Sequence, residues 1–314
     1  FRALRTIPVM MDICADIERF CPEAVFLNYT NPMPMLCKAM QTYSKAHVIG
    51  ICHSVQGTAE MLAKWLGASI DQVSYLCAGI NHQAWFLKYF VDGKDALPKL
   101  RQIVQNQPDI YEAEIVRNEM FLHLGYYVTE SSGHNSEYNP WFRKRQDLLD
   151  QYCRRGTSWN PGETNFSIKK ISERDANRDK EKAAWLAKDE IDLKRGKEYA
   201  SGILNALIGD GSPFEFNANL LNQGMITNLP RQTCIEVPVV ASPKGLVPAF
   251  IGDLPAHLAI LNSINAQCDD LAVAGSFAGD PQMIYHAICH DPLTAAVLSL
   301  KEIQEMVDEL FRAH

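Results

Sequence analysis

Residues 24–54 read AVFLNYTNPMPMLCKAMQTYSKAHVIGICHS, and this stretch decides the fold. It contains two short apolar runs, at 24–27 and 48–51, which are typical of strands buried on both faces of a parallel sheet. Between them, apolar side chains recur at helical spacing from Met33 to Tyr43. The stretch therefore predicts a strand, a helix and a second strand, the alternation that builds a parallel sheet.

Helices are predicted on both sides of this unit. Thr6 can cap one helix, and a second helix is expected over 58–66, where Gly67 would end it. The first 70 residues thus resemble the closing half of a doubly wound domain. Because the chain has no GxGxxG motif and opens at Phe1 without a methionine, we expect the opening half of that domain, with its glycine-rich turn, to lie outside this chain.

The remainder of the chain indicates an α+β unit. Residues 75–80 predict a strand with a hairpin partner over 85–91, and a polar loop is expected at 129–140. The other predicted elements are helices over 96–124, 176–194, 199–207, 255–274, 281–289 and 301–312, strands over 214–221 and 234–240, and irregular structure at 154–170. The sequence therefore predicts an α/β fold in two domains, residues 1–72 and residues 73–314.

Charge and composition exclude several classes of protein. A net charge of -7 and a pI near 5.7 argue against nucleic-acid binding, which usually needs a basic patch. No run approaches the roughly 18 consecutive apolar residues of a transmembrane helix. The nine cysteines include no CxxC pair and suit buried thiols in a reducing compartment. We therefore expect a cytoplasmic protein that binds neither nucleic acid nor membrane.

Chemically reactive side chains follow two of the predicted strands. Cys52 and His53 come directly after the second strand, and Asn81 and His82 come directly after the third. Because ligands of open α/β sheets bind at the carboxyl ends of strands, a thiolate and an imidazole placed there could share a metal ion. The alternatives are a cysteine that packs as a small hydrophobic residue and a histidine that caps a loop.

Two further sites have a functional and a structural interpretation. Asn31 precedes Pro32 at the end of the first strand, where its amide could hold a sugar hydroxyl or could simply start a turn. The polar loop carries His134 and Tyr138 beside Gly133. A loop so dense in titratable groups is often functional, although it can also be only solvated.

Several segments are similar to the motifs of one enzyme family. They are residues 27–32 (LNYTNP), 50–58 (GICHSVQGT), 77–82 (CAGINH) and 129–142 (TESSGHNSEYNPWF), supported by residues 2–8, 228–230 and 236–238. On these motifs, which span the chain in a fixed order, the sequence resembles glycoside hydrolase family 4. It is most similar to the branch of bacterial α-galactosidases from melibiose systems.

The resemblance implies a Rossmann-type NAD-binding domain followed by a domain like the C-terminal domain of lactate and malate dehydrogenases. This chain would hold only the C-terminal part of the Rossmann-like parallel sheet, so the main NAD contacts cannot be assigned to its residues. Family members use NAD and a divalent metal, usually Mn²⁺, and form homodimers or homotetramers. They oxidise C3 of an α-glycoside, remove the C2 proton and eliminate the leaving group, as the NAD-dependent exception among glycosidases.

Carried over residue by residue, the resemblance assigns the binding groups. The metal ligands fall on Cys52 and His82, and the substrate-binding asparagine falls on Asn31, with Asn81 expected to line the same site. A thiolate favours softer metals, whereas Mn²⁺ prefers oxygen donors. The resemblance therefore implies that sugar oxygens and water complete the coordination.

The acid and the base are assigned in the same way. Many family members carry an aspartate directly after the metal-binding cysteine as the acid, and this chain has His53 at that position. A histidine can take that role when its pKa lies near the working pH. For the base, Tyr138 is the first candidate and His134 is the second.

The resemblance leaves alternatives for the function. The leading one is the hydrolysis of α-galactosides, and related substrates such as α-galacturonides or α-glucosides are the next. An NAD-dependent 2-hydroxy acid dehydrogenase-like protein and an inactive fragment without the cofactor half are the others.

Overall fold

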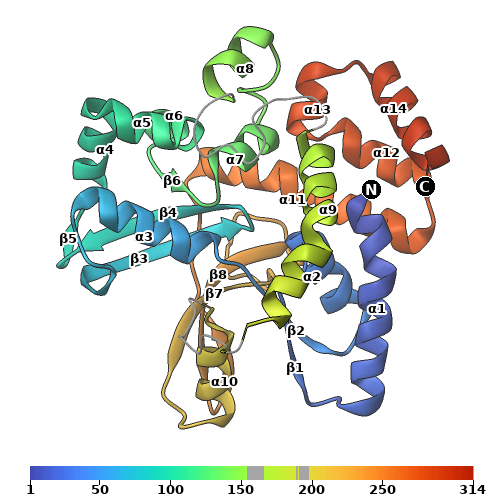
Figure 1. The fold of residues 1–314 in the computed structure, drawn as a ribbon, viewed down its shortest axis with the longest axis horizontal. Helices are drawn as coiled ribbons and strands as arrows, with labels where there is room; N and C mark the ends of the chain where they lie inside the picture. The colour runs from blue at the N-terminus through green and yellow to red at the C-terminus, as the bar shows by residue number, and fades with distance from the viewer. Residues whose placement is uncertain (154–165, 189, 191–197, 314) are drawn as a thin grey trace.

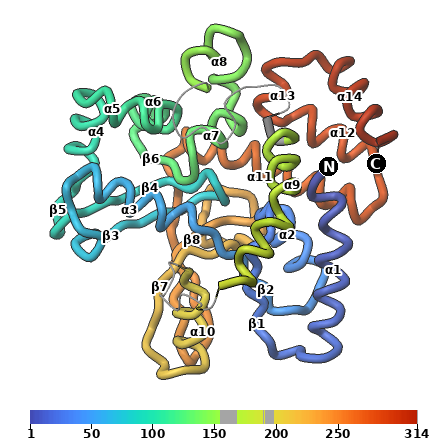
Figure 2. Tube along the Cα trace, in the orientation of Figure 1, coloured from blue at the N-terminus to red at the C-terminus, as the bar shows by residue number. Residues whose placement is uncertain are grey.

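The structure is a computed structural model that describes residues 1–153, 166–188, 190 and 198–313. Its centre is a nine-stranded sheet with the order β1-β2-β7-β8-β3-β4-β5, in which β6 pairs with β4 and β9 pairs with β8. The β7–β8 hairpin therefore lies between the β1–β2 pair and the β3–β4 hairpin (Figures 1 and 2). The α/β fold class predicted from the sequence is confirmed.

The N-terminal part of the chain has the predicted alternation of helices and strands. It forms α1 (Arg2–Phe20), β1 (Val25–Asn28), α2 (Met33–Tyr43), β2 (His47–Ile51) and α3 (Ser54–Leu66). Strands β1 and β2 pair in parallel, whereas all other pairings between strands of this sheet are antiparallel. Gly67 ends α3 in the left-handed conformation, with φ of 72°, which confirms the predicted stop.

The remaining elements follow η1, a 3-10 helix at Ile70–Gln72. The strands are β3 (Val73–Ile80), β4 (Gln83–Val91), β5 (Lys94–Asp95), β6 (Tyr127–Val128), β7 (Phe214–Leu221), β8 (Cys234–Ser242) and β9 (Gly245–Pro248). The helices are α4 (Leu97–Asn106), α5 (Pro108–Ala113), α6 (Ile115–Leu124), α7 (Ser132–Tyr138), α8 (Gln146–Tyr152), α9 (Phe166–Leu186), α10 (Ala200–Ile208), α11 (Ala256–Ala278), α12 (Pro281–Cys289), α13 (Pro292–Val297) and α14 (Leu300–Ala313).

Two of the sequence predictions are wrong in detail. The polar loop predicted at 129–140 contains α7, a helix too short and too polar to show an apolar period. The charged helix α9 begins at Phe166 and ends at Leu186, so residues 166–170, which we expected to be irregular, are helical. The other residues of that irregular segment, 154–165, and the predicted helical residues 189 and 191–194 lie outside the described part of the chain.

Helix α11 connects the hydrophobic clusters of the core. Leu258, near its start, packs with Trp85 of β4 and with α6. Ala266 packs against residues of β3 and β8, and Val273 packs against α1 and α2. The long helix thus holds the β1–β2 side and the β3–β4 side of the sheet in one packed unit, which keeps the ends of β2 and β3 in a fixed relation.

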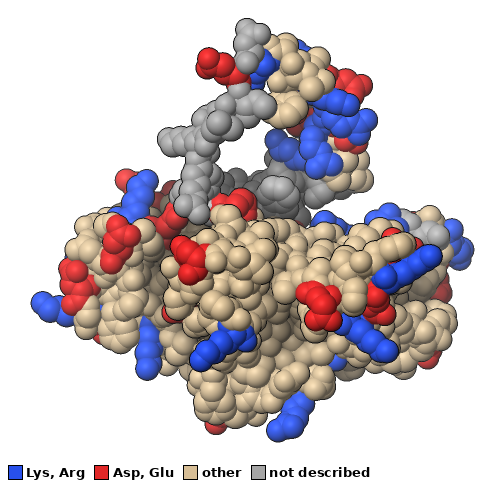
Figure 3. Space-filling model, turned by 90° about the horizontal axis from the view of Figure 1, so that it is seen from below, with Lys and Arg blue, Asp and Glu red and all other residues tan. Residues whose placement is uncertain are grey.

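On the face drawn in Figure 3, acidic and basic side chains are interspersed rather than gathered into one basic patch. Among the described residues, none of the helices combines the length and the apolar character that crossing a bilayer requires.

Close packing of β2 against α2 yields a testable prediction. A Cβ atom on Gly50 would lie 2.8 Å from Cβ of Asn219 and closer still to the sulfur atoms of Cys37 and Met33. We therefore expect Gly50→Ala to lower the free energy of unfolding by about 1–3 kcal/mol in urea denaturation. Gly57→Ala in α3 is the control, because its Cβ would meet nothing within 4 Å. Equal stability of the two variants would contradict this account of the packing.

Candidate metal and sugar site

The ends of β2 and β3 meet at one row of the sheet. Antiparallel pairings join, in order, Gly50, Asn219, Glu236 and Gly79. Because the three pairings are all antiparallel, β2 and β3 run in opposite directions and approach the row from opposite sides. We expected the reactive residues that follow β2 and β3 to lie at the carboxyl ends of strands in an open α/β sheet, and the structure differs in that these two strands are antiparallel. The β7–β8 hairpin between them brings their ends together.

Three potential metal ligands gather where the two strands end. One ligand atom each from Cys52, His82 and Glu130 lies within 4.8 Å of the others, and His82 Nε2 is 3.5 Å from Glu130 Oε2. Ligand atoms lie about 2.0–2.3 Å from an ion such as zinc, so two of them can be up to roughly 4.5 Å apart. The thiol, imidazole and carboxylate therefore fit one cation after small side-chain movements, with open positions left for other ligands.

The backbone is strained at two of these three residues. His82 has a φ of 63° and Glu130 a φ of 71°. Both lie in the left-handed region of the backbone, which residues other than glycine rarely adopt. Asn81 and His82 form the two-residue loop between β3 and β4. Residues held in such conformations cluster at functional sites, because the surrounding structure must hold them there.

Helix α7 brings the two candidate bases to the same place. Tyr138 Oη lies 3.1 Å from His82 Nδ1, and His134 Nδ1 lies 3.8 Å from Glu130 Oε1. The rings of His82 and His134 are 5.3 Å apart. His82 and His134 thus lie on the carboxylate of Glu130, and Tyr138 lies on the other ring nitrogen of His82, which is distant in sequence from the other three residues.

Burial shifts the pKa of both candidate bases, in opposite directions. It raises the pKa of Tyr138 well above its usual value, and the nearby carboxylates of Glu130 and Glu137 act in the same direction. Burial lowers the pKa of His134, while the charge of Glu130 opposes this change. His134 is therefore neutral near pH 7 and Tyr138 keeps its proton in the metal-free protein.

His53 lies in different surroundings. Its side chain is 56% exposed, and its Nε2 atom lies 2.7 Å from Glu198. The ring also stacks on Tyr29 at 5.4 Å. The hydrogen bonds that His53 makes within the described residues do not reach the group of Cys52, His82 and Glu130, which we call the donor cluster.

The two candidate asparagines are already engaged by the protein. Asn31 Oδ1 accepts a hydrogen bond from Met33 N at 3.2 Å, which is the turn chemistry that the sequence offered as an alternative. Asn81 Nδ2 donates to Glu236 Oε2 at 3.4 Å. The Oδ1 atom of Asn81 is buried and has no hydrogen-bond partner among the described residues. Asn81 directly precedes His82 of the donor cluster and is held against Glu236.

Two acidic residues of the site were missed from the sequence. Glu236 is fully buried in β8, and its pKa is raised well above the usual value by burial and by Cys52, against the effect of His82. A carboxylate inside the apolar run CIEVPVV (234–240) is a signal, because such groups are rarely buried without a partner. Glu130 had a weaker signal, since it was only one polar residue of a predicted loop.

Two models of one protein family match most of the chain, and named relatives are similar over nearly its whole length. The model described as "Family 4 glycosyl hydrolase" matches residues 1–68, and the model described as "Family 4 glycosyl hydrolase C-terminal domain" matches residues 77–294. The chain is 40% identical to the α-galactosidase of Bacillus subtilis, over 100% of this chain and 71% of that protein. It is 36% identical to the α-galactosidase of Rhizobium meliloti, over 98% of this chain and 63% of that protein.

A solved structure shares the fold. It is the 6-phospho-β-glucosidase of Thermotoga maritima with manganese, NAD⁺ and glucose-6-phosphate, which superposes with a TM-score of 0.74 at 16% identity. The superposition covers 99% of this chain and 70% of that protein.

The donor cluster can be tested by metal binding. We expect the protein to bind Co²⁺ and to show the charge-transfer absorption of a thiolate ligand, because Cys52 is one of the three donors. Cys52→Ser should lose this band completely, whereas Cys21→Ser, which changes an exposed thiol, should keep it. A band that survives in Cys52→Ser would show that the thiolate ligand is elsewhere.

Proposed function

The chain belongs to glycosyl hydrolase family 4, a family of glycosidases, and on this premise we propose that it hydrolyses α-galactosides with NAD and a divalent metal ion. The similarity to two α-galactosidases over nearly the whole chain carries this proposal. Relatives named α-galacturonidase and α-glucosidase are less similar, at 26% identity. The donor cluster adds a site that can hold the metal.

The donor set supports a divalent cation such as Mn²⁺. With the Cys52 thiolate and the His82 imidazole alone, the site would favour a softer metal. Glu130 adds the oxygen donor that Mn²⁺ prefers, at 3.5 Å from His82 Nε2. We therefore propose Cys52, His82 and Glu130 as the protein ligands, with the sugar oxygens in the open positions.

A metal held by Cys52, His82 and Glu130 would supply positive charge at the sugar oxygens, and NAD would supply the capacity to oxidise C3. The protein's own residues would then move protons. We propose Tyr138 as the base that takes the C2 proton, because its hydroxyl lies 3.1 Å from His82 Nδ1, where the charge of a bound metal would lower its raised pKa and release its own proton. His134 is the second candidate, since burial keeps its ring neutral and able to accept a proton.

The remaining residues would bind the sugar and protonate the leaving group. We propose His53 as the acid, because it directly follows Cys52, at the position where many family members carry the aspartate that serves as the acid. Asn31 and Asn81 would hold sugar hydroxyls. In Asn81 this role is supported by the buried Oδ1 atom, for which no hydrogen-bond partner is present in the described part of the chain.

We also propose a homodimeric or homotetrameric protein of the cytoplasm, as the family resemblance implies. All nine cysteines are free thiols, and this supports a reducing compartment because disulfides form mainly in oxidising ones.

The proposed activity predicts a strict cofactor dependence. The protein that carries this chain should hydrolyse nitrophenyl α-galactoside only when NAD, Mn²⁺ and a reductant are all present, because the reaction needs an oxidised C3. The matched substrates are the α-galacturonide and the α-glucoside, on which we expect slower turnover. Hydrolysis without NAD or without metal would exclude oxidation and elimination, and faster turnover of the galacturonide would reassign the substrate.

The choice of base yields a separate prediction. With the α-galactoside in deuterated water, Tyr138→Phe should slow exchange of the C2 proton by about 100-fold or more, the usual contribution of general base catalysis. Tyr111→Phe, which removes a hydroxyl that donates to Glu119 at 2.7 Å, should exchange at the normal rate. Normal exchange in Tyr138→Phe together with its loss in His134→Ala would make His134 the base.

A further inference from the structure

A buried ion pair lies beside the donor cluster without belonging to it. Arg117 Nε donates to Glu114 Oε2 at 2.8 Å, and the two side chains are only 3% and 6% exposed. Charges buried in this way are costly unless the rest of their hydrogen-bonding capacity is also used. The partners that use it therefore show what the pair holds in place.

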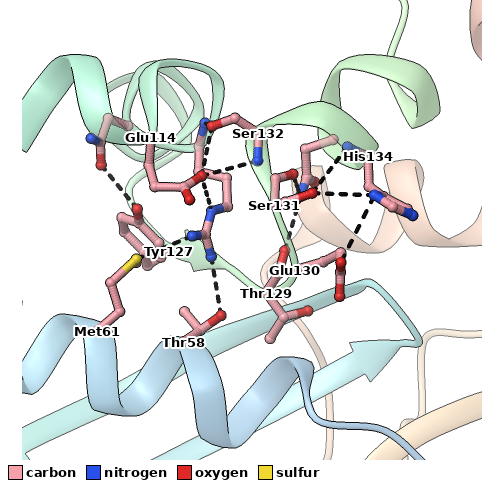
Figure 4. Close-up of polar contacts among 12 residues, drawn as sticks. Thr58, Met61, Glu114, Tyr127, Thr129, Glu130, Ser131, Ser132 and His134 are labelled. Carbon is pink, nitrogen blue, oxygen red and sulfur yellow. Dashed lines mark hydrogen bonds and ion pairs between the residues drawn. The ribbon is translucent and has the colours of Figure 1, made fainter. Parts of the chain in front are cut away.

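Arg117 connects the pair to the helix that follows Cys52. Its Nη1 atom donates to Thr58 Oγ1 at 3.0 Å, and its Nη2 atom lies 3.2 Å from Met61 Sδ. The guanidinium also lies over the ring of Tyr127, at 5.4 Å. In Figure 4, Thr58 and Met61 of α3 lie below Glu114 and Ser132.

Glu114 connects the pair to the segment that carries Glu130. Its Oε2 atom accepts hydrogen bonds from Ser132 N at 3.0 Å and from Ser132 Oγ at 2.7 Å. Ser132 is the first residue of α7 and comes two residues after Glu130 (Figure 4). The carboxylate therefore fixes both the backbone and the side chain at the start of this helix.

The other side of Glu130 is fixed as well. Thr129 N donates to Ala84 O at 2.9 Å, and Thr129 O accepts from Asn135 Nδ2 at 2.9 Å. Glu130 is thus held in its left-handed conformation between two anchored neighbours. Without the anchor at Ser132, the backbone could relax to an ordinary φ, and the carboxylate would turn away from His82.

We infer that Glu114 and Arg117 are positioning residues, which hold the carboxylate of Glu130 at the metal site through Ser132. The inference rests on the proposed function, because it assumes that Glu130 is a metal ligand. A positioning role also explains why a buried carboxylate, rather than an apolar side chain, contacts Ser132. An ion pair needed only for stability could be replaced by apolar side chains, whereas the hydroxyl and amide of Ser132 require an acceptor of this shape and charge.

The test uses Co²⁺ affinity and urea unfolding as two separate readouts. Ser132→Ala removes both hydrogen bonds of the hydroxyl, to Glu114 Oε2 and from Arg117 N, and leaves the ion pair. It should therefore raise the Co²⁺ Kd by about 10-fold to 100-fold, as is usual for groups that orient metal ligands. Ser132→Thr keeps the hydroxyl and should restore the wild-type Kd. Glu114→Gln should act like Ser132→Ala, and if it fails to fold, the two serine variants decide.

Tyr89→Phe is the matched control. It removes one buried hydrogen bond to the same turn of α3, from Tyr89 Oη to Ala59 O at 2.7 Å. It should lower the urea midpoint and leave the Co²⁺ Kd unchanged. A wild-type Kd in Ser132→Ala would overturn the positioning role alone. Absence of Co²⁺ binding in the wild-type protein would overturn the proposed metal site as well, so the two failures are distinguishable.

Discussion

The pairings that join Gly50, Asn219, Glu236 and Gly79 across the sheet hold the ends of β2 and β3 together. Cys52 follows one end, and the loop with His82 follows the other. Because the β7–β8 hairpin lies between the two strands, their ends stay in register although the strands come from opposite directions. Helix α11 packs across both sides of the sheet and makes this arrangement rigid. A ligand pair on such strands needs little reorganisation to bind a cation.

The polar groups around these strand ends have a cost that the fold must offset. Glu236 is fully buried, and its carboxylate accepts hydrogen bonds from two asparagine amides at 3.4 Å. Burial raises the pKa of this carboxyl well above its usual value, because it disfavours the charged form. Two residues of the donor cluster also keep a left-handed backbone. Strain and buried polar groups of this kind persist where function requires them, and here both occur at one place.

The sequence predicts those parts of the molecule that depend on local pattern. Apolar runs and helical spacing identify β1, α2 and β2, and the turn at 81–82 identifies the β3–β4 hairpin. Parallel pairing occurs only between β1 and β2 among the described strands. The sequence did not predict this limit, because a short apolar run does not show which strand it will pair with. Glu130 could not be identified as a neighbour of His82, because their contact depends on tertiary packing of a helix too short to be predicted. The family resemblance indicated the surrounding segment, and the structure adds the carboxylate.

Above all, we propose that Cys52, His82 and Glu130 bind one divalent metal ion. The most direct measurement is anomalous diffraction from crystals of the protein grown with Mn²⁺, recorded on both sides of the manganese edge. We expect a single strong anomalous peak between the Cys52 sulfur, a ring nitrogen of His82 and the Glu130 carboxylate. A peak at another set of side chains, or a peak that lacks Cys52 among its neighbours, would contradict the account.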